Sequence, residues 1–453
     1  MFENPSSAHW RTALLIFVSA GIILGAAPAR AWEHEPLAAF QQRREQLARQ
    51  TADGIVVFYG YEETDVAAAT TSFRQNENFY YLTGWNQPDA MMMIIPAKGS
   101  SSPPREILFI PPKDKAQERW TGPRLDPKVS DASDVTGFAK VMSTAEFAAR
   151  LQKALKRFHK IYTELTPQPE SGEECFQKDE VADLHKLAPA AELADLRPLV
   201  TRMRMVKSAG EIALIRKAVH ASVDAQLAAM KAVRLGMWEY QAAALIKYTF
   251  ENEGCEWPSY PPIVGAGFNS TVLHYDDDSS QMHAGDVVVI DAAGSYSGYA
   301  SDITRTLPVD GHYTPRQLEI YNVVLGAQRA AITAARPGAY VSGDHHPESL
   351  NQVARDYINS HGRDLQGGRL GKYFIHGLSH PVGLNVHDPF IPNQPLEPGM
   401  VITIEPGIYI PREKIGVRIE DMILITPGGS EVLTRRLPKD PQAVEQIMAA
   451  AAK

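Results

Sequence analysis

The stretch that decides the fold is Val287–Leu307, VVVIDAAGSYSGYASDITRTL. Two apolar, β-branched runs flank a short turn rich in Gly and Ser, which is the pattern of a β-hairpin. Each run carries one aspartate, Asp291 in the first and Asp302 in the second. A turn centred on Tyr296-Ser297 places the two aspartates directly opposite each other, with Cβ atoms roughly 4.5–5.5 Å apart. Like charges so placed among apolar residues repel, and a hard cation between them removes the conflict.

A second acidic pair repeats this arrangement towards the C-terminus. The segments Val401–Glu405 and Gly416–Glu420 flank a turn near Arg412-Glu413, and this spacing predicts that Glu405 faces Glu420. A bulge in either hairpin would shift the register by one residue and move a carboxylate to the other face. The sequence therefore predicts two facing acidic pairs, with the register of each left open by one residue.

Histidines lie between the two hairpins, in His376-Gly-Leu-Ser-His380-Pro-Val-Gly and in His387-Asp388. Four carboxylates with imidazole and no thiolate suit two hard-to-borderline divalent ions, Mn²⁺ before Co²⁺ or Zn²⁺. Two such ions ~3.5–4 Å apart can share a hydroxide nucleophile and stabilise a hydrolytic transition state. Each of these residues, taken alone, could equally be a non-catalytic residue: a turn cap, a structural histidine or part of a solvated strand edge. Their concentration in one half of the chain favours a metal site.

The chain is organised as two domains, because 453 residues exceed one ordinary core. Strands alternating with helices predict an α/β domain over residues 32–199. A capping box at Ser143/Glu146 predicts a helix to about His159 in this first domain. A second capping box at Ser208/Glu211, and Thr314 as N-cap with Pro315 and Gln317 after it, then open long helices in a second domain, residues 200–453. Two helix pairs, each followed by strands with acidic residues, suggest an internal duplication.

Composition excludes some classes of partner. The chain is 44% hydrophobic and 22% charged, and its net charge of −8 without a Lys/Arg cluster argues against nucleic acid. Its two cysteines, Cys175 and Cys255, have no zinc-ligand spacing. They are read as buried free thiols, with a single long-range disulfide left open.

The first 31 residues read as a signal peptide. Arg11 precedes an apolar run from Ala13 to Ala29, and Ala29-Arg30-Ala31 fits the A-x-A cleavage rule. A retained membrane anchor is the alternative, but the run is short for a span of ~20 residues. We therefore expect an exported protein, periplasmic or secreted, whose mature chain starts near Trp32 and keeps no stable membrane anchor.

Both domains contain distinctive motifs. Those in the second domain are Leu273-His274-Tyr275, Asp291-Ala-Ala-Gly with Gly298-Tyr-Ala-Ser-Asp302, His376–His380, Val386-His387-Asp388, Ile404–Gly407 and Gly416–Asp421. The first domain contributes Phe73–Gly84 and Arg119–Leu125. As a set, these motifs resemble aminopeptidase P, a family of pita-bread metallopeptidases that remove an N-terminal residue preceding proline. The resemblance covers nearly all of the expected mature chain. It implies an α/β N-terminal domain followed by an α+β pita-bread catalytic domain.

The resemblance also implies roles for individual residues. Two Mn²⁺ ions are expected on a set of five ligands, Asp291, Asp302, His380, Glu405 and Glu420. Asp302 and Glu420 would bridge the ions, and Glu405 would also steer the proton of a bridging hydroxide. Three histidines are expected to line the substrate site and polarise the scissile carbonyl: His274, His376 and His387. Arg418, two residues before Glu420, would support that carboxylate.

Some features depart from the family or leave alternatives. Pro381 follows His380 where members usually carry an aromatic or aliphatic residue, which leaves the pocket shape open. Export departs from the mostly cytosolic bacterial members. A prolidase, which cleaves Xaa-Pro dipeptides with the same ligands, is the alternative activity, but Phe73–Gly84 favours aminopeptidase P. Methionine aminopeptidase lacks such an N-terminal domain, and a binding protein on an inactive scaffold is disfavoured because all five ligands are present. Proline-containing peptides are the expected partners, and a homo-oligomer is left open.

Overall fold

The structure is a computed structural model that describes residues 33–62, 73–97, 103–165, 180–343 and 346–451. The expected signal peptide, residues 1–31, and Cys175 lie outside these ranges. The described residues all belong to one unit, residues 32–453. Among them, no helix combines the length and apolar character that crossing a membrane requires.

The N-terminal half is built on a six-stranded mixed sheet of order β4-β3-β2-β1-β5-β6. Strand β2 is antiparallel to both of its neighbours, and the remaining pairs are parallel. The strands are β1 (Ile55–Tyr59), β2 (Met91–Ile95), β3 (Arg105–Ile110), β4 (Lys140–Ser143), β5 (Lys160–Thr163) and β6 (Glu192–Asp195).

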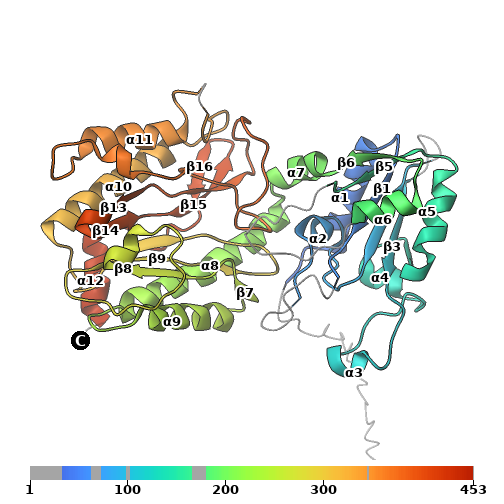
Figure 1. Ribbon diagram of the computed structural model, residues 1–453, viewed down its shortest axis with the longest axis horizontal. Coiled ribbons are helices and arrows are strands. Elements are labelled where there is room, and N and C mark those ends of the chain that lie inside the picture. Colours follow the sequence, from blue (N-terminus) through green and yellow to red (C-terminus); the bar gives the residue numbers. More distant parts are fainter. Residues whose placement is uncertain (1–32, 63–72, 98–102, 166–179, 344–345, 452–453) are drawn as a thin grey trace, which may run out of the picture. The chain divides into compact units, whose positions relative to one another are not determined.

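Alternation along these strands gives the sheet two buried faces. In β1, Ile55 and Val57 pack into one apolar cluster, and Val56 and Phe58 into another. Helices α5 and α6 cover the first face, α1 and α2 the second (Figure 1). The helices of this half are α1 (Leu37–Gln50), α2 (Glu77–Thr83), α3 (Glu118–Thr121), α4 (Ala132–Thr136), the 3₁₀ turn η1 (Thr144–Glu146), α5 (Phe147–Leu155) and α6 (Glu180–Leu187). The α/β prediction for this half is confirmed.

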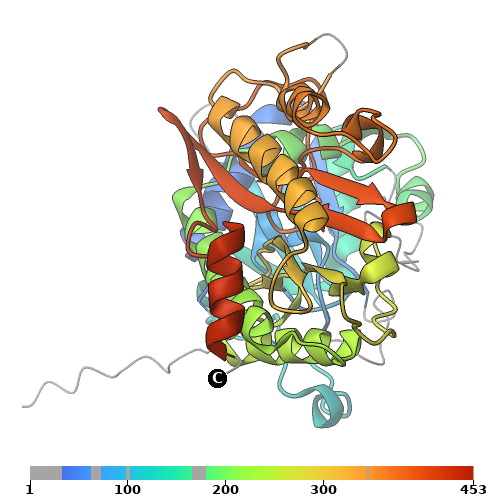
Figure 2. The same ribbon diagram turned by 90° about the vertical axis from the view of Figure 1, so that its left-hand side faces the viewer.

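After α7 (Arg197–Met205), the C-terminal half repeats one plan twice: a pair of helices followed by antiparallel strands. The first pair precedes the sheet β11-β9-β8, and the second precedes β12-β15-β16 and β13-β14. The helices are α8 (Ala209–Ala232), α9 (Glu239–Asn252), α10 (Pro315–Ala334), α11 (Leu350–His361) and α12 (Pro441–Ala451). In Figure 2, helix α10 crosses the red strands of the second set. The α+β expectation is therefore also confirmed.

The strands of this half are short. They are β7 (Trp257–Pro258), β8 (Ile263–Ala266), β9 (Val287–Asp291), β10 (Gly294–Ser295), β11 (Thr304–Pro308), β12 (Val401–Ile404), β13 (Gly407–Ile410), β14 (Ile415–Arg418), β15 (Asp421–Thr426) and β16 (Gly429–Val432). Short 3₁₀ turns occur at η2 (Gly267–Thr271), η3 (Leu370–Tyr373) and η4 (Pro411–Glu413). The predicted capping box at Ser208/Glu211 and the predicted N-cap Thr314 are present and fix the starts of α8 and α10. The predicted box at Ser143/Glu146 is not formed, because the Ser143 side chain accepts from the Ala145 amide and starts η1 instead.

The predicted register of the first hairpin is wrong by two residues. Asp291 pairs with Thr304, and the turn is centred on Ser297-Gly298. Both turn residues have positive φ, 50° and 80°, as in the type I′ turns that match the twist of a hairpin. Because side chains alternate with a period of two, this shift keeps Asp302 on the same face as Asp291.

The predicted register of the second hairpin is confirmed on both sides of its glutamates. Ile404 pairs with Asp421 and Gly407 with Arg418, so Glu405 and Glu420 face each other between two ladder segments. At this break the Glu405 amide donates to Leu378 O (2.9 Å) and the Glu420 amide to Thr304 O (3.1 Å). The pairing of the two strands is thus interrupted where the carboxylates project.

Asp388 anchors the loop that carries His387. Its carboxylate pairs with Arg204 at the end of α7 (2.6 Å) and with Lys207 (3.1 Å), and all three side chains are buried. It also accepts a hydrogen bond from the Asn385 amide at 3.2 Å. A Cβ at Gly383 would lie 2.5 Å from the same carboxylate, so glycine is required there.

Removing this charge should destabilise the fold. Burial alone would raise the pKa of Asp388, but Arg204 and Lys207 outweigh it and lower that pKa. The stabilisation is therefore complete above the unfolded pKa of about 3.9 and is lost as pH falls through the folded value. Asp388→Asn removes the negative charge that balances two buried cations. We therefore expect the free energy of unfolding, measured by urea denaturation at pH 7, to fall by about 3 kcal/mol.

The control is Asp224→Asn, which removes the partner of Arg436 in an ion pair whose side chains are 48% and 28% exposed. That change should cost less than about 1 kcal/mol. The difference in the free energy of unfolding between Asp388→Asn and wild type should become smaller below about pH 4. Equal losses for Asp388→Asn and Asp224→Asn would contradict the anchoring role.

Candidate metal centre

Strand ends bring the acidic residues of the two hairpins together. Asp291 ends β9 and Asp302 lies just before β11, while Glu405 follows β12 and Glu420 lies between β14 and β15. Asp302, His380 and Glu420 each offer a ligand atom, and these atoms lie within 4.8 Å of one another. The structure thus brings together residues more than a hundred positions apart in sequence.

His380 is held beside β12 by backbone bonds. Thr403 donates its amide to His380 O (3.0 Å), and the His380 amide donates to Thr403 Oγ1 (3.1 Å). The ring then points at two carboxylates, with Nε2 3.3 Å from Asp302 Oδ2 and 3.3 Å from Glu405 Oε1. His380 therefore joins the first hairpin to the second.

Tyr260 connects Asp291 to the rest of the cluster. The Tyr260 hydroxyl lies 2.5 Å from Asp291 Oδ1 and also contacts Asp302 Oδ1, so it links the two aspartates. Sequence reasoning missed Tyr260, because its loop carries no pattern of charge or spacing.

Arg418 contacts Asp291 directly and reaches Glu420 through Thr304. Its Nη2 pairs with Asp291 Oδ2 at 2.5 Å, because β14 packs against β9 and brings the guanidinium there. Its Nε donates to Thr304 Oγ1 at 3.2 Å, and the Thr304 hydroxyl donates to Glu420 Oε2 at 2.6 Å. The sequence did not single out Thr304 or the direct contact with Asp291.

Mutual repulsion and burial dominate the electrostatics of the cluster. Burial, then the charges of Asp302 and Glu405, raise the pKa of Glu420 well above its ordinary value. Burial and the charge of Asp291 raise the pKa of Asp302 to about 6, against the opposing hydrogen bond with His380. Burial would lower the pKa of His380, but its bonds to Asp302 and Glu405 outweigh it and raise that pKa well above 6.5.

The cluster contains a carboxylate oxygen without a hydrogen-bond partner. This oxygen, Glu420 Oε1, is buried and has no partner among the described residues. A buried, unpaired carboxylate oxygen is costly, and divalent cations supply the missing partner. The donor set, carboxylate oxygens with one imidazole, is that of a hard-to-borderline metal ion. The residues present therefore fit divalent metal ions.

His376 stands beside the cluster in a defined tautomer. Its Nδ1 lies 2.8 Å from Gly377 O, which can only accept, so Nδ1 carries the proton and Nε2 accepts from Tyr409 OH at 2.9 Å. Tyr409 OH in turn accepts from Arg418 Nη1 at 2.9 Å. Burial lowers the pKa of His376, so the imidazole is neutral at pH 7.

The other two predicted histidines approach the same place. The His387 ring is edge-on to that of His380, with centroids 4.3 Å apart. Burial and the charge of His380 lower the pKa of His387 to about 4. His274 lies close enough to lower the pKa values of both His376 and His387. All three histidines therefore converge beside the carboxylates.

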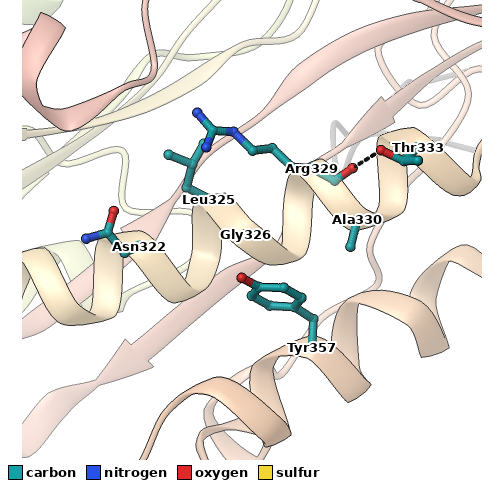
Figure 3. Close-up of a pocket in the computed structure, with 7 residues that line it drawn as sticks. All are labelled: Asn322, Leu325, Gly326, Arg329, Ala330, Thr333 and Tyr357. Atoms are coloured by element: carbon teal, nitrogen blue, oxygen red, sulfur yellow. Dashed lines mark hydrogen bonds between the residues drawn. The ribbon is translucent and has the colours of Figure 1, made fainter.

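A surface groove lies elsewhere, between α10 and α11 (Figure 3). Its volume is about 560 Å³, and the Tyr357 ring of α11 packs directly on Gly326 of α10 in its lining. None of its lining residues belongs to the cluster, so the groove is separate from the candidate metal centre.

Two sequence families match this chain. The model of metallopeptidase family M24 matches residues 213–427, which include every member of the cluster. The model of the aminopeptidase P N-terminal domain matches residues 40–162, within the first half.

Individual relatives give the same picture. The Xaa-Pro aminopeptidase of Escherichia coli is 35% identical over 91% of this chain and 98% of its own length. The solved structure of Escherichia coli aminopeptidase P with the inhibitor Pro-Leu has a TM-score of 0.80 and 32% identity, over 93% of this chain and all of that one. The Xaa-Pro dipeptidase of Pyrococcus horikoshii is 39% identical, but over 56% of this chain and 70% of its own length.

Neutralising a single carboxylate should separate metal binding from folding. We expect Asp302→Asn and Glu420→Gln to fold but to bind divalent metal more than about tenfold more weakly, measured by calorimetric titration of the apo protein. Apo Asp302→Asn should melt above apo wild type, because one repulsive charge is gone.

The control is Glu413→Gln, which changes a largely buried carboxylate paired with Arg316 outside the cluster. Its metal affinity should equal that of wild type. Retention of two tightly bound ions by Asp302→Asn or Glu420→Gln would show that the ligand assignment is wrong.

Proposed function

The chain belongs to the aminopeptidase P group of metallopeptidase family M24, and from this membership we propose the roles of its active-site residues. It is a metal-dependent peptidase that releases the N-terminal residue from peptides with proline in the second position. This function is supported by family matches over both halves of the chain, together with a buried carboxylate cluster whose donor atoms suit divalent ions.

We propose that two Mn²⁺ ions occupy the cluster. The proposed ligands are Asp291, Asp302, His380, Glu405 and Glu420, with Asp302 and Glu420 shared between the ions. Support comes from the oxygen-rich donor set and from the unpaired Glu420 Oε1. Divalent ions bound there would lower the pKa of a bound water molecule and polarise a carbonyl oxygen.

Glu405 is the proposed acceptor of a proton from the attacking water. Burial would raise the pKa of Glu405, but the hydrogen bond and charge of His380 outweigh it and hold the pKa below its ordinary value. The carboxylate is therefore ionised at neutral pH. Thr403 Oγ1 orients Oε1 at 3.1 Å, which fixes the direction from which a proton is taken.

Arg418 and the three histidines are proposed to hold the substrate site in shape. Arg418 pairs with Asp291 and, through Tyr409, orients His376. His274, His376 and His387 present imidazoles beside the cluster. A peptide bond to proline has no N–H, so the site needs no acceptor for that group.

Prolidase activity has weaker support. The dipeptidase relative covers 56% of this chain, whereas the aminopeptidase relative covers 91%. The match of residues 40–162 to the aminopeptidase P N-terminal domain also favours the longer-peptide activity.

We further propose that the mature chain starts near Trp32 and is exported. The proposed domain boundary at residues 199/200 falls within α7, the helix between the two halves. The apolar run Ala13–Ala29 and the Ala29-Arg30-Ala31 site support export. Mass spectrometry of protein recovered from the periplasm or medium should give a terminus near Trp32. An intact Met1 on soluble cytosolic protein would contradict export.

Substrate preference follows from the same assignment. An Xaa-Pro-Xaa tripeptide should be cleaved at least about tenfold faster than the matching Xaa-Ala-Xaa peptide and than the Xaa-Pro dipeptide, in steady-state kcat/KM. Cleavage confined to dipeptides would favour prolidase, and equal rates for alanine peptides would exclude proline specificity.

Metal removal should affect activity and stability together. Chelation should abolish hydrolysis and lower Tm, since metal at a hundredfold excess over Kd adds about 2.7 kcal/mol to the folded state. Mn²⁺ should restore both. Full activity in the chelated protein would contradict the metal dependence.

A further inference from the structure

A buried glutamine of α8, Gln226, reaches the strand ends of the first hairpin. Its side chain is fully buried, and its Nε2 donates to Ile303 O at 3.0 Å and to Ile290 O and Ala292 O at 3.3 Å. Those three carbonyls lie on both sides of Asp291 and directly after Asp302. One amide group therefore contacts the backbone of both strands that carry the aspartates.

Gln328 of α10 makes the equivalent contacts in the second hairpin. It is also fully buried, and its Nε2 donates to Ile419 O at 3.0 Å and Ile404 O at 3.2 Å. These carbonyls belong to the peptide groups that lead into Glu420 and Glu405. Each glutamine lies on the first helix of its helix pair, so the two positions match in the duplicated plan.

The chemistry of these sites suits a donor with two hydrogens. Two or three carbonyl oxygens converge on each Nε2, and an amide nitrogen can donate to both strands of its hairpin at once. Gln226 Oε1 is buried without a partner among the described residues, so this side chain is placed by its N–H groups alone. Lys439 Nζ donates to Gln328 Oε1 at 2.7 Å and fixes the second amide.

We propose that Gln226 and Gln328 are positioning residues for the metal ligands. The carboxylates of the two hairpins repel one another, and the ladder is interrupted where Glu405 and Glu420 project, so repulsion can spread the strands there. A glutamine that ties both strands of a hairpin to one helix keeps the carboxylates at the spacing that a cation needs. The inference rests on the proposed ligand set.

The test replaces each glutamine with methionine, which keeps the length of the side chain and removes its donors. Calorimetric titration of the apo protein with Mn²⁺ should show affinity about tenfold weaker for Gln226→Met and for Gln328→Met. The visible absorption of Co²⁺ bound to each variant should change, since it reports ligand geometry. Asn variants, which shorten the reach, provide the same readouts where a Met variant does not fold.

The matched control is Gln317→Met. Gln317 is buried on the same helix as Gln328 and donates to Gly285 O at 2.8 Å, away from the carboxylates. Its replacement should lower Tm but leave Mn²⁺ affinity and the Co²⁺ spectrum unchanged. Unchanged affinity in Gln226→Met and Gln328→Met, or an equal loss in Gln317→Met, would overturn the proposal.

Asp302→Asn in the same titration separates this inference from the function on which it rests. Weak binding by Asp302→Asn with normal binding by both glutamine variants would overturn the positioning role and keep the ligand set. Normal binding by Asp302→Asn would overturn the ligand set itself.

Discussion

The structure depends on one electrostatic constraint, the burial of four carboxylates beside one another. Asp291, Asp302, Glu405 and Glu420 converge with a single imidazole among them, and the pKa values of Asp302 and Glu420 rise as a result. Arg418 forms an ion pair with Asp291, and Glu420 Oε1 has no partner among the described residues. Folding therefore leaves a charge imbalance at the cluster that divalent cations resolve, and catalysis uses the same ions.

The duplicated architecture of the C-terminal half places one pair of these carboxylates in each repeat. Each helix pair supports a hairpin, and each hairpin places two acids where its strands end or break. The amides of Glu405 and Glu420 bond to Leu378 and Thr304 rather than to each other, so both side chains can leave the ladder. Buried glutamines on α8 and α10 then supply donors to the carbonyls beside the acids.

The N-terminal half contributes to the same site through the His387 loop. Arg74, from the Phe73–Gly84 motif, donates to Leu384 O at 2.8 Å, and Asn78 accepts from Arg204 at 2.6 Å. Arg204 in turn holds Asp388. The Phe73–Gly84 motif therefore supports the loop that carries His387 through a chain of partly buried polar contacts.

The sequence alone determined the fold class, the acidic pairs and the register around Glu405 and Glu420, because hydrophobic alternation and facing charges are local properties. It missed the shift at Asp291, since the Ser297-Gly298 turn depends on backbone angles that composition does not specify. Tyr260, Thr304 and the Asp291 partnership of Arg418 were decided only by tertiary structure. They join segments that no spacing rule connects, and packing of β14 against β9 sets which carboxylate the guanidinium reaches.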